Sequence, residues 1–395
     1  MSVSFDSPTL WQRVRPVFAG FDGPLTLAIF LMALAGLITM YSAGFDHGTR
    51  FVDHGRNMLL ALVILFVVAQ VPPQRLLALA VPLYVAGVTL LVLTAVTGIT
   101  KKGATRWLDV GVVIQPSEIL KIATPLMLAW WFQRREGHVR VPDFLIALLL
   151  LAVPVGLIVK QPDLGTAILV MAAGLFVIFF AGLSWRLIIP VLLLAASAVT
   201  AIVVSSETIC EPDVTWPLLR PYQKNRVCTL LDPTTDPLGK GFHTIQGMIA
   251  IGSGGLHGKG FMKGTQTHLE FIPERTTDFI FAAFSEEFGL FGCITLLLGY
   301  VFLIGRGLMI AAEAPSVFTR LLGGAVTMSL FTYAFVNMGM VAGILPVVGV
   351  PLPFVSYGGT AMVTLGLGLG ILMSIAKKPS AGAGVALARA AGRYA

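Results

Sequence analysis

The sequence predicts an all-α polytopic membrane protein with about ten transmembrane helices and one large extracytoplasmic loop between helices 7 and 8. Two observations predict this fold class. Of the 395 residues, 56% are hydrophobic and only 12% are charged, with a mean hydropathy of +0.86, whereas soluble domains carry about 25% charged residues. Apolar runs of roughly 20 residues, long enough to cross about 30 Å of hydrocarbon, also recur along the chain.

The apolar runs divide the chain into five parts. The first run is not preceded by a charged n-region or followed by a small-residue cleavage site, so it is interpreted as a retained span and not as a signal peptide. The runs lie near 25–43, 56–71, 76–98, 113–132, 143–160, 164–183, 186–204, 279–305, 317–343 and 357–376. The predicted parts are an N-terminal tail (1–24), helices 1–7 (25–204), the large loop (205–278), helices 8–10 (279–376) and a C-terminal tail (377–395).

Lysine and arginine residues set the predicted orientation, because cytoplasmic loops carry an excess of them. Most of those in short loops fall on one side of a ten-span arrangement, so both termini are predicted to be cytoplasmic. The net charge is +7, but the sequence has no basic run interleaved with aromatic residues of the kind that indicates nucleic-acid binding. The basic residues predicted in the outer loops after the first and third spans need another reason to be there, and these are Arg50, Arg56, Lys101, Lys102 and Arg106.

The large loop, residues 205–278, holds two of the three cysteines and a helical pattern. An oxidising compartment would permit a disulfide between Cys210 and Cys228, worth about 3 kcal/mol on the chain-entropy estimate, and two free thiols are the alternative. In residues 241–258, apolar residues at helical spacing precede a glycine cluster. This predicts a helix that ends in a flexible hinge and lies either on the membrane surface or against the rim of the bundle.

Asp278 is the ionisable residue that topology explains least, because it lies where the large loop enters an apolar run. A carboxylate there should face protein, water or a substrate and marks a candidate functional site. Glu118 and Lys121 share a helix face, and Lys121 must snorkel or find a carboxylate partner. Glu118 can also be an ordinary helix-start residue after Pro116.

Three further residues complete the polar set at the outer side. Asp163, in a tight outer turn, can be a plain helix cap or an additional carboxylate. Arg106 and Trp107 lie in an outer loop, where Trp107 can be an interfacial anchor. If the charged residues converge, carboxylates that accept a proton or hold a divalent cation meet cations that suit a diphosphate. This chemistry suggests a polyprenyl-diphosphate substrate, although proton-coupled transport also uses buried carboxylates.

Five segments carry a family resemblance: GATRWLDVG, QPSEILK, KQPDLGTA, PERTTDFIFAAFSEEFG and GVPLPFVSYGG. In this order and with these spans, the chain resembles the SEDS family of shape, elongation, division and sporulation proteins over nearly its whole length. The stretch LDPTTDPLGKGFHTIQGMIAIGSGGLHGKG is similar to the rod-shape, or elongation, branch. The resemblance implies a peptidoglycan glycosyltransferase that polymerises lipid II into glycan strands during cell elongation, at the periplasmic face of the cytoplasmic (inner) membrane.

The resemblance also implies roles for individual residues. Asp278 matches the family's essential loop aspartate, and we interpret it as a general base that deprotonates the acceptor 4-hydroxyl. The product is then an inverted glycan, with undecaprenyl diphosphate as the leaving group. The substrate-binding residues expected from the motifs are Arg106, Trp107, Glu118, Lys121, Asp163, Glu274 and Arg275, with Arg56 as a looser match.

The implied partner is a class B penicillin-binding protein that crosslinks the glycan, with lipid II as donor and the growing glycan as acceptor. No His or Cys spacing typical of a metal site is present, so a divalent cation, Mg²⁺ or Mn²⁺, would rest on carboxylates and substrate phosphates. No organic cofactor is expected. Two alternatives remain open: a lipid II flippase and a non-catalytic scaffold of the cell-wall elongation complex.

Overall fold

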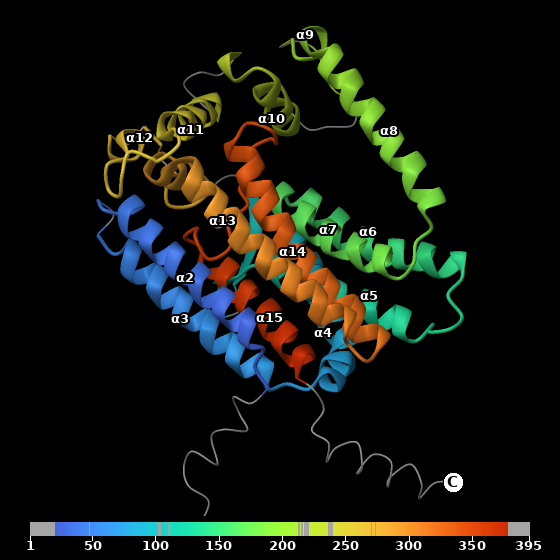
Figure 1. The fold of residues 1–395 in the computed structure, drawn as a ribbon. Helices are drawn as coiled ribbons and strands as arrows, with labels where there is room; N and C mark the ends of the chain where they lie inside the picture. Colours follow the sequence, from blue (N-terminus) through green and yellow to red (C-terminus); the bar gives the residue numbers. More distant parts are fainter. Residues whose placement is uncertain are drawn as a thin grey trace, which may run out of the picture.

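The computed structural model describes residues 20–46, 48–101, 104–109, 111, 113–211, 214, 216, 221–235, 240–269, 271–272 and 274–377. Within these residues, each predicted apolar run corresponds to one long helix (Figure 1). Those before the large loop are α2 (Gly23–Ala43), α3 (Arg50–Ala69), α4 (Pro73–Thr97), α5 (Pro116–Gln133), α6 (Val141–Lys160), α7 (Leu164–Phe180) and α8 (Trp185–Val204). Those after it are α13 (Ile280–Ala312), α14 (Val317–Val341) and α15 (Gly359–Ala376).

The helices form a membrane-type bundle. By length and composition, 8 helices of the described residues can cross a membrane; α7, with 17 residues, is a shorter apolar helix, and α5 is not among the 8. The bundle centre holds α14 and α15, each with 67% of its most apolar window buried. There α15 packs against α3, and α14 packs against α13 and α7. The predicted fold class, a helical polytopic membrane protein, is therefore confirmed.

Helix α8 differs from the others because none of its residues is buried. It stands apart from the bundle at one side, as Figure 1 shows. The beginning of α2 and the end of α15 lie at one end of the bundle, and the helices of the large loop lie at the opposite end (Figure 1). This arrangement places the two ends of the membrane region together.

Two local features differ from the prediction. A three-stranded antiparallel sheet, β1 (Ile99–Lys101), β2 (Ala104–Asp109) and β3 (Val113–Ile114), lies between α4 and α5. Strands β1 and β3, with 3 and 2 residues, are too short to show a period in the sequence, and the 6 residues of β2 do not alternate between apolar and polar. Helix α3 begins at Arg50 and not near residue 56, so the prediction that Arg50 and Arg56 lie in a loop is wrong. Hydropathy detects only the apolar part of a helix whose first turns are polar.

The large loop folds into short helices stabilised by a covalent crosslink. They are α9 (Ser206–Ile209), α10 (Pro221–Leu231), the 3₁₀ turn η1 (Pro233–Thr235), α11 (Lys240–Gly254) and α12 (Thr265–His268). Cys210 and Cys228 form a disulfide, so of the two alternatives left open the structure has the crosslink. The Lys224 ammonium donates to the carbonyl of Glu211 at 2.5 Å and to that of Val214 at 2.6 Å.

The glycine cluster after α11 is not a flexible hinge, and this prediction is wrong. Helix α11 packs against α13, which favours the rim position over the membrane surface. Gly258 has a φ of +77°, and a Cβ there would lie 2.1 Å from the Glu287 carbonyl oxygen. Only glycine allows this approach of two backbones.

The close contact between these two backbones compensates for a break in α13. Gly289 has φ 62° and ψ −163°, which interrupts the helical hydrogen bonds around it. The freed carbonyls of Glu286 and Glu287 accept from the N–H groups of residues 259 and 260 at 2.9 and 3.0 Å. The freed N–H groups of residues 290 and 291 donate to the carbonyls of residues 255 and 256 at 2.9 and 3.2 Å. A broken membrane helix is tolerated because these groups are satisfied by protein.

Candidate active site

Asp278 lies in a tight turn that leads into α13, and its side chain is partly buried. The carbonyl oxygen of Glu274 closes this turn by accepting from the N–H groups of Thr277 and Phe279, both at 3.1 Å. The hydroxyl of Thr277 also donates to the Glu274 carboxylate at 2.7 Å. Glu274 therefore shapes the turn that carries Asp278.

The segment between α14 and α15 forms the other wall of this turn. The Ser356 hydroxyl donates to the Thr277 carbonyl at 2.7 Å and accepts from the Leu352 N–H at 2.7 Å. The Tyr357 N–H donates to the Thr276 carbonyl at 2.8 Å. These bonds join the turn to the proline- and glycine-rich segment, for which the sequence predicts no site residue.

Arg275 secures the same turn to the loop after α2. Its side chain is only 2% exposed, it forms an ion pair with Asp46, and its Nε donates to the Ala43 carbonyl at 3.1 Å. The guanidinium also lies over the ring of Phe45, 5.5 Å from the centroid. The arrangement gives Arg275 an anchoring position, while substrate binding by Arg275 stays a prediction.

Glu118 and Lys121 form a buried pair on α5. The Lys121 Nζ lies 2.6 Å from Glu118 Oε1, and the Lys121 side chain is 8% exposed. The second Glu118 oxygen accepts from the Thr364 hydroxyl of α15 at 3.1 Å. Lys121 Nζ lies 5.5 Å from the centroid of the Tyr333 ring of α14. The carboxylate partner that Lys121 required is thus the one predicted from helical spacing.

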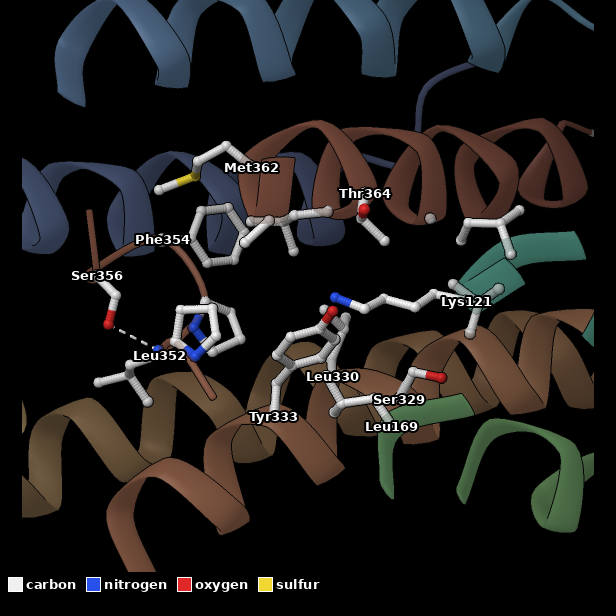
Figure 2. Close-up of a pocket in the computed structure, with 17 residues that line it drawn as sticks. Lys121, Leu169, Ser329, Leu330, Tyr333, Leu352, Phe354, Ser356, Met362 and Thr364 are labelled. Atoms are coloured by element: carbon white, nitrogen blue, oxygen red, sulfur yellow. Dashed lines mark hydrogen bonds between the residues drawn. The ribbon is translucent and has the colours of Figure 1, made fainter. Parts of the chain in front are cut away.

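A partly open pocket adjoins this pair. Figure 2 shows Lys121 and Tyr333 entering it with their polar ends toward one another, and Ser356 at the opposite side. Its wall is mostly apolar, with residues such as Leu169, Leu330 and Phe354. Ser356 both lines the pocket and bonds the Thr277 carbonyl, so one residue connects the pocket wall to the turn that carries Asp278.

Arg106 and Asp163 form a second polar cluster. Arg106 Nη1 lies 3.7 Å from Asp163 Oδ1, and the guanidinium also donates to the carbonyls of Gln161, at 3.4 Å, and Pro162. Asp163 caps α7 by accepting from the Thr166 N–H at 3.2 Å, which is the helix-cap alternative. Gln115 Nε2 donates to Asp163 at 3.0 Å and to Ser117 at 3.1 Å, so the cluster adjoins the start of α5.

The predicted residues converge only in part. Arg56 is apart, with a side chain that is 75% exposed and paired with Asp53 at 3.2 Å on α3. Trp107 lies on β2 beside Arg106 and is partly buried. Within the described residues, no group of three or more His, Cys, Asp or Glu side chains could hold a metal ion. A cation would therefore need oxygen atoms from the substrate as well.

Sequence reasoning missed Tyr333, Asn337, Ser356 and Thr364. Asn337 is 0% exposed. Polar residues inside membrane helices are functional candidates, so an asparagine in this apolar run was a signal that could have found it. Ser356 stands in the GVPLPFVSYGG motif, which carried the family resemblance without a residue role. The other two look like ordinary helix residues.

This fold and site define a class of protein. Residues 24–381 match the family described as cell cycle proteins of the FtsW, RodA and SpoVE type, and the chain belongs to that family. Among its relatives is the peptidoglycan glycosyltransferase MrdB of Escherichia coli K12, 48% identical over 93% of this chain and 95% of that protein. The probable peptidoglycan glycosyltransferase FtsW of Geobacter metallireducens is 32% identical, over 89% of this chain and 94% of that protein.

Solved structures share the fold. One chain of a peptidoglycan synthase complex, described as coordinating polymerization and crosslinking, has a TM-score of 0.73 and 31% identity, covering 90% of this chain and 97% of that one. The rod shape determining protein RodA of Thermus thermophilus has a TM-score of 0.65 and 27% identity, covering 91% and 98%. Both comparisons cover about nine tenths of this chain.

Proposed function

We propose that this protein is a peptidoglycan glycosyltransferase that polymerises lipid II during cell elongation. The observation that carries the proposal is a largely apolar pocket whose wall includes the Lys121 ammonium and Ser356, the residue that bonds the turn carrying Asp278. The names of relatives at 48% and 32% identity point to the same activity. An apolar wall with a few polar groups suits a lipid carrier that bears a charged head group.

In the proposed reaction, Asp278 accepts the proton of the acceptor 4-hydroxyl as this oxygen bonds to the anomeric carbon of the donor. The bond between that carbon and the diphosphate oxygen breaks, and undecaprenyl diphosphate leaves with the electron pair. Attack from the opposite face inverts the configuration. Lys121 and Arg106 are proposed to stabilise the developing charge on the leaving group, and a well-placed donor contributes about 3 kcal/mol.

Lys121 begins the reaction already paired with Glu118, so its charge is largely compensated before substrate binds. A diphosphate must therefore share the ammonium with Glu118, which supports the proposal that a divalent cation assists. The one or two carboxylates available fit Mg²⁺, which is commonly bound by so few protein oxygens together with substrate phosphates. Such an ion would neutralise charge on the leaving diphosphate.

The proposed orientation places both termini in the cytoplasm and the site at the periplasmic face. It is supported by the basic short loops and by the shared end of α2 and α15 (Figure 1). A class B penicillin-binding protein is the proposed partner. The fold shared with a chain of a complex that coordinates polymerization and crosslinking supports it.

The test compares wild type with Asp278→Asn as purified proteins, with and without the candidate partner, using labelled lipid II and Mg²⁺. We expect Asp278→Asn to bind lipid II and to make no glycan ladder on a gel. Glu313→Gln, which removes one exposed carboxylate at the opposite end of α13, is the matched control and should polymerise normally. Near-normal ladders from Asp278→Asn would remove Asp278 from the chemistry. No ladder from wild type, even with an active transpeptidase partner, would favour a flippase or a scaffold.

A further inference from the structure

Asn337 connects three parts of the site through one buried amide. Its side chain is 0% exposed in α14, and its Nδ2 donates to the Asp278 carbonyl at 3.0 Å and to the Val350 carbonyl at 2.7 Å. The orientation of this amide is determined by its partners, because rotating it would place its oxygen against two carbonyl oxygens. Asn337 therefore acts as a double donor.

The bond from Asn337 complements the bond from Ser356. Ser356 holds the peptide group that precedes the Asp278 Cα, through the Thr277 carbonyl at 2.7 Å. Asn337 holds the peptide group that follows this Cα, through the Asp278 carbonyl. Because each peptide group is planar, anchoring both restricts the φ and ψ angles of Asp278. The Asp278 carboxylate can then change position only through rotation about its side-chain torsions.

Gly349 restricts those torsions from the other side. A Cβ built on Gly349 would lie 3.3 Å from Asp278 Oδ2, so the backbone of residue 349 lies directly against the carboxylate. Gly349 also has a φ of +76°, a conformation that favours glycine. The neighbouring residue, Val350, is the second acceptor of the Asn337 amide, so the same side chain also positions this wall.

We infer that Asn337 is a positioning residue for Asp278: it fixes the backbone of the proposed base and the wall against which the carboxylate packs. This inference rests on the proposed function of Asp278. The energetic reason is that general-base catalysis requires the carboxylate within hydrogen-bond reach of the acceptor hydroxyl. A misplacement of about 1 Å can cost about 100-fold in rate without weakening binding equally.

The test measures kcat and KM for lipid II, lipid II binding and thermal stability in the full-length protein with its partner. We expect Asn337→Ala to lower kcat by about 100-fold while KM stays within a few-fold of wild type. Thr332→Val is the matched control, because it removes a buried hydroxyl of α14 that bonds only the Met328 carbonyl in the same helix, at 3.0 Å. Its kcat and KM should both stay near wild type.

Gly349→Ala tests the inference by a second route, because it keeps the Asn337 side chain but strains the backbone at a φ of +76° and places a Cβ 3.3 Å from Asp278 Oδ2. It should also lower kcat more than it raises KM, even if Asn337→Ala fails to fold. The inference would be overturned if Asn337→Ala folds and has a normal kcat, or if Gly349→Ala has a normal kcat. It would also be overturned if either variant loses lipid II binding to the same extent as kcat. If Asp278→Asn is inactive while both variants are normal, only the positioning role fails. If Asp278→Asn polymerises normally, the proposed base and this inference fail together.

Discussion

Removing the Lys259 ammonium should weaken the contact between α13 and the glycine cluster that follows α11. The Glu286 carboxylate is 0% exposed, and Lys259 Nζ contacts it at 2.6 Å. The remaining donors to this carboxylate are groups of residues 265–267, at 3.0 to 3.3 Å, and the Ser253 hydroxyl, at 3.5 Å. Loss of one hydrogen bond between charged groups costs about 2 kcal/mol, which corresponds to about 30-fold in an opening equilibrium.

The assay is amide hydrogen exchange in Lys259→Met. The N–H groups of residues 259 and 260 bond the carbonyls of Glu286 and Glu287, and their protection against exchange should fall about 30-fold. The protection of the N–H groups in the inner half of α13 should not change. Lys263→Met is the control, because Lys263 is an exposed lysine of the same segment and has no ion pair within the described residues. Unchanged protection in Lys259→Met would refute the conclusion that this ion pair holds residues 259 and 260 against α13.

Two further predictions concern other charges. Lys121→Met should lower kcat about 100-fold, and adding Glu118→Gln should restore thermal stability but not activity if Lys121 stabilises the leaving group; restored glycan synthesis would contradict that role. Asp22 caps α2, and its hydrogen bond from Arg306 lowers its pKa despite opposing burial. Its stabilising effect is therefore present at neutral pH and lost as pH falls through that lowered pKa. In a thermal-melt series against pH, Asp22→Asn should flatten the acid limb; an unchanged limb would contradict this.

The helices could be predicted because hydropathy is a local property. Each apolar run became one helix, and the Glu118 and Lys121 pair followed from their i, i+3 spacing on α5. The beginning of α3 was misplaced since its first turns, from Arg50, are polar. Membrane insertion is read from the apolar part of a span, and helix formation continues beyond it.

The environment of Asp278 could not be predicted, since its contacts come from distant segments. Asn337 bonds the Asp278 carbonyl across 59 positions, and Ser356 bonds the Thr277 carbonyl across 79. Neither a single asparagine in an apolar helix nor a serine in a proline-rich segment indicates its partner. The glycine cluster was misread for the same reason, because glycine permits both flexibility and close backbone contact.

The repaired break in α13 limits how this chain can change in length. Residues 255, 256, 259 and 260 are matched one to one with residues 290, 291, 286 and 287 by backbone hydrogen bonds. Adding or deleting one residue on either side would shift this pairing by one position and leave peptide groups at the break in α13 without these partners. Surface loops generally tolerate such changes. Here the segment between α11 and α12 should accept new side chains more readily than a new residue count, apart from its closely packed glycines.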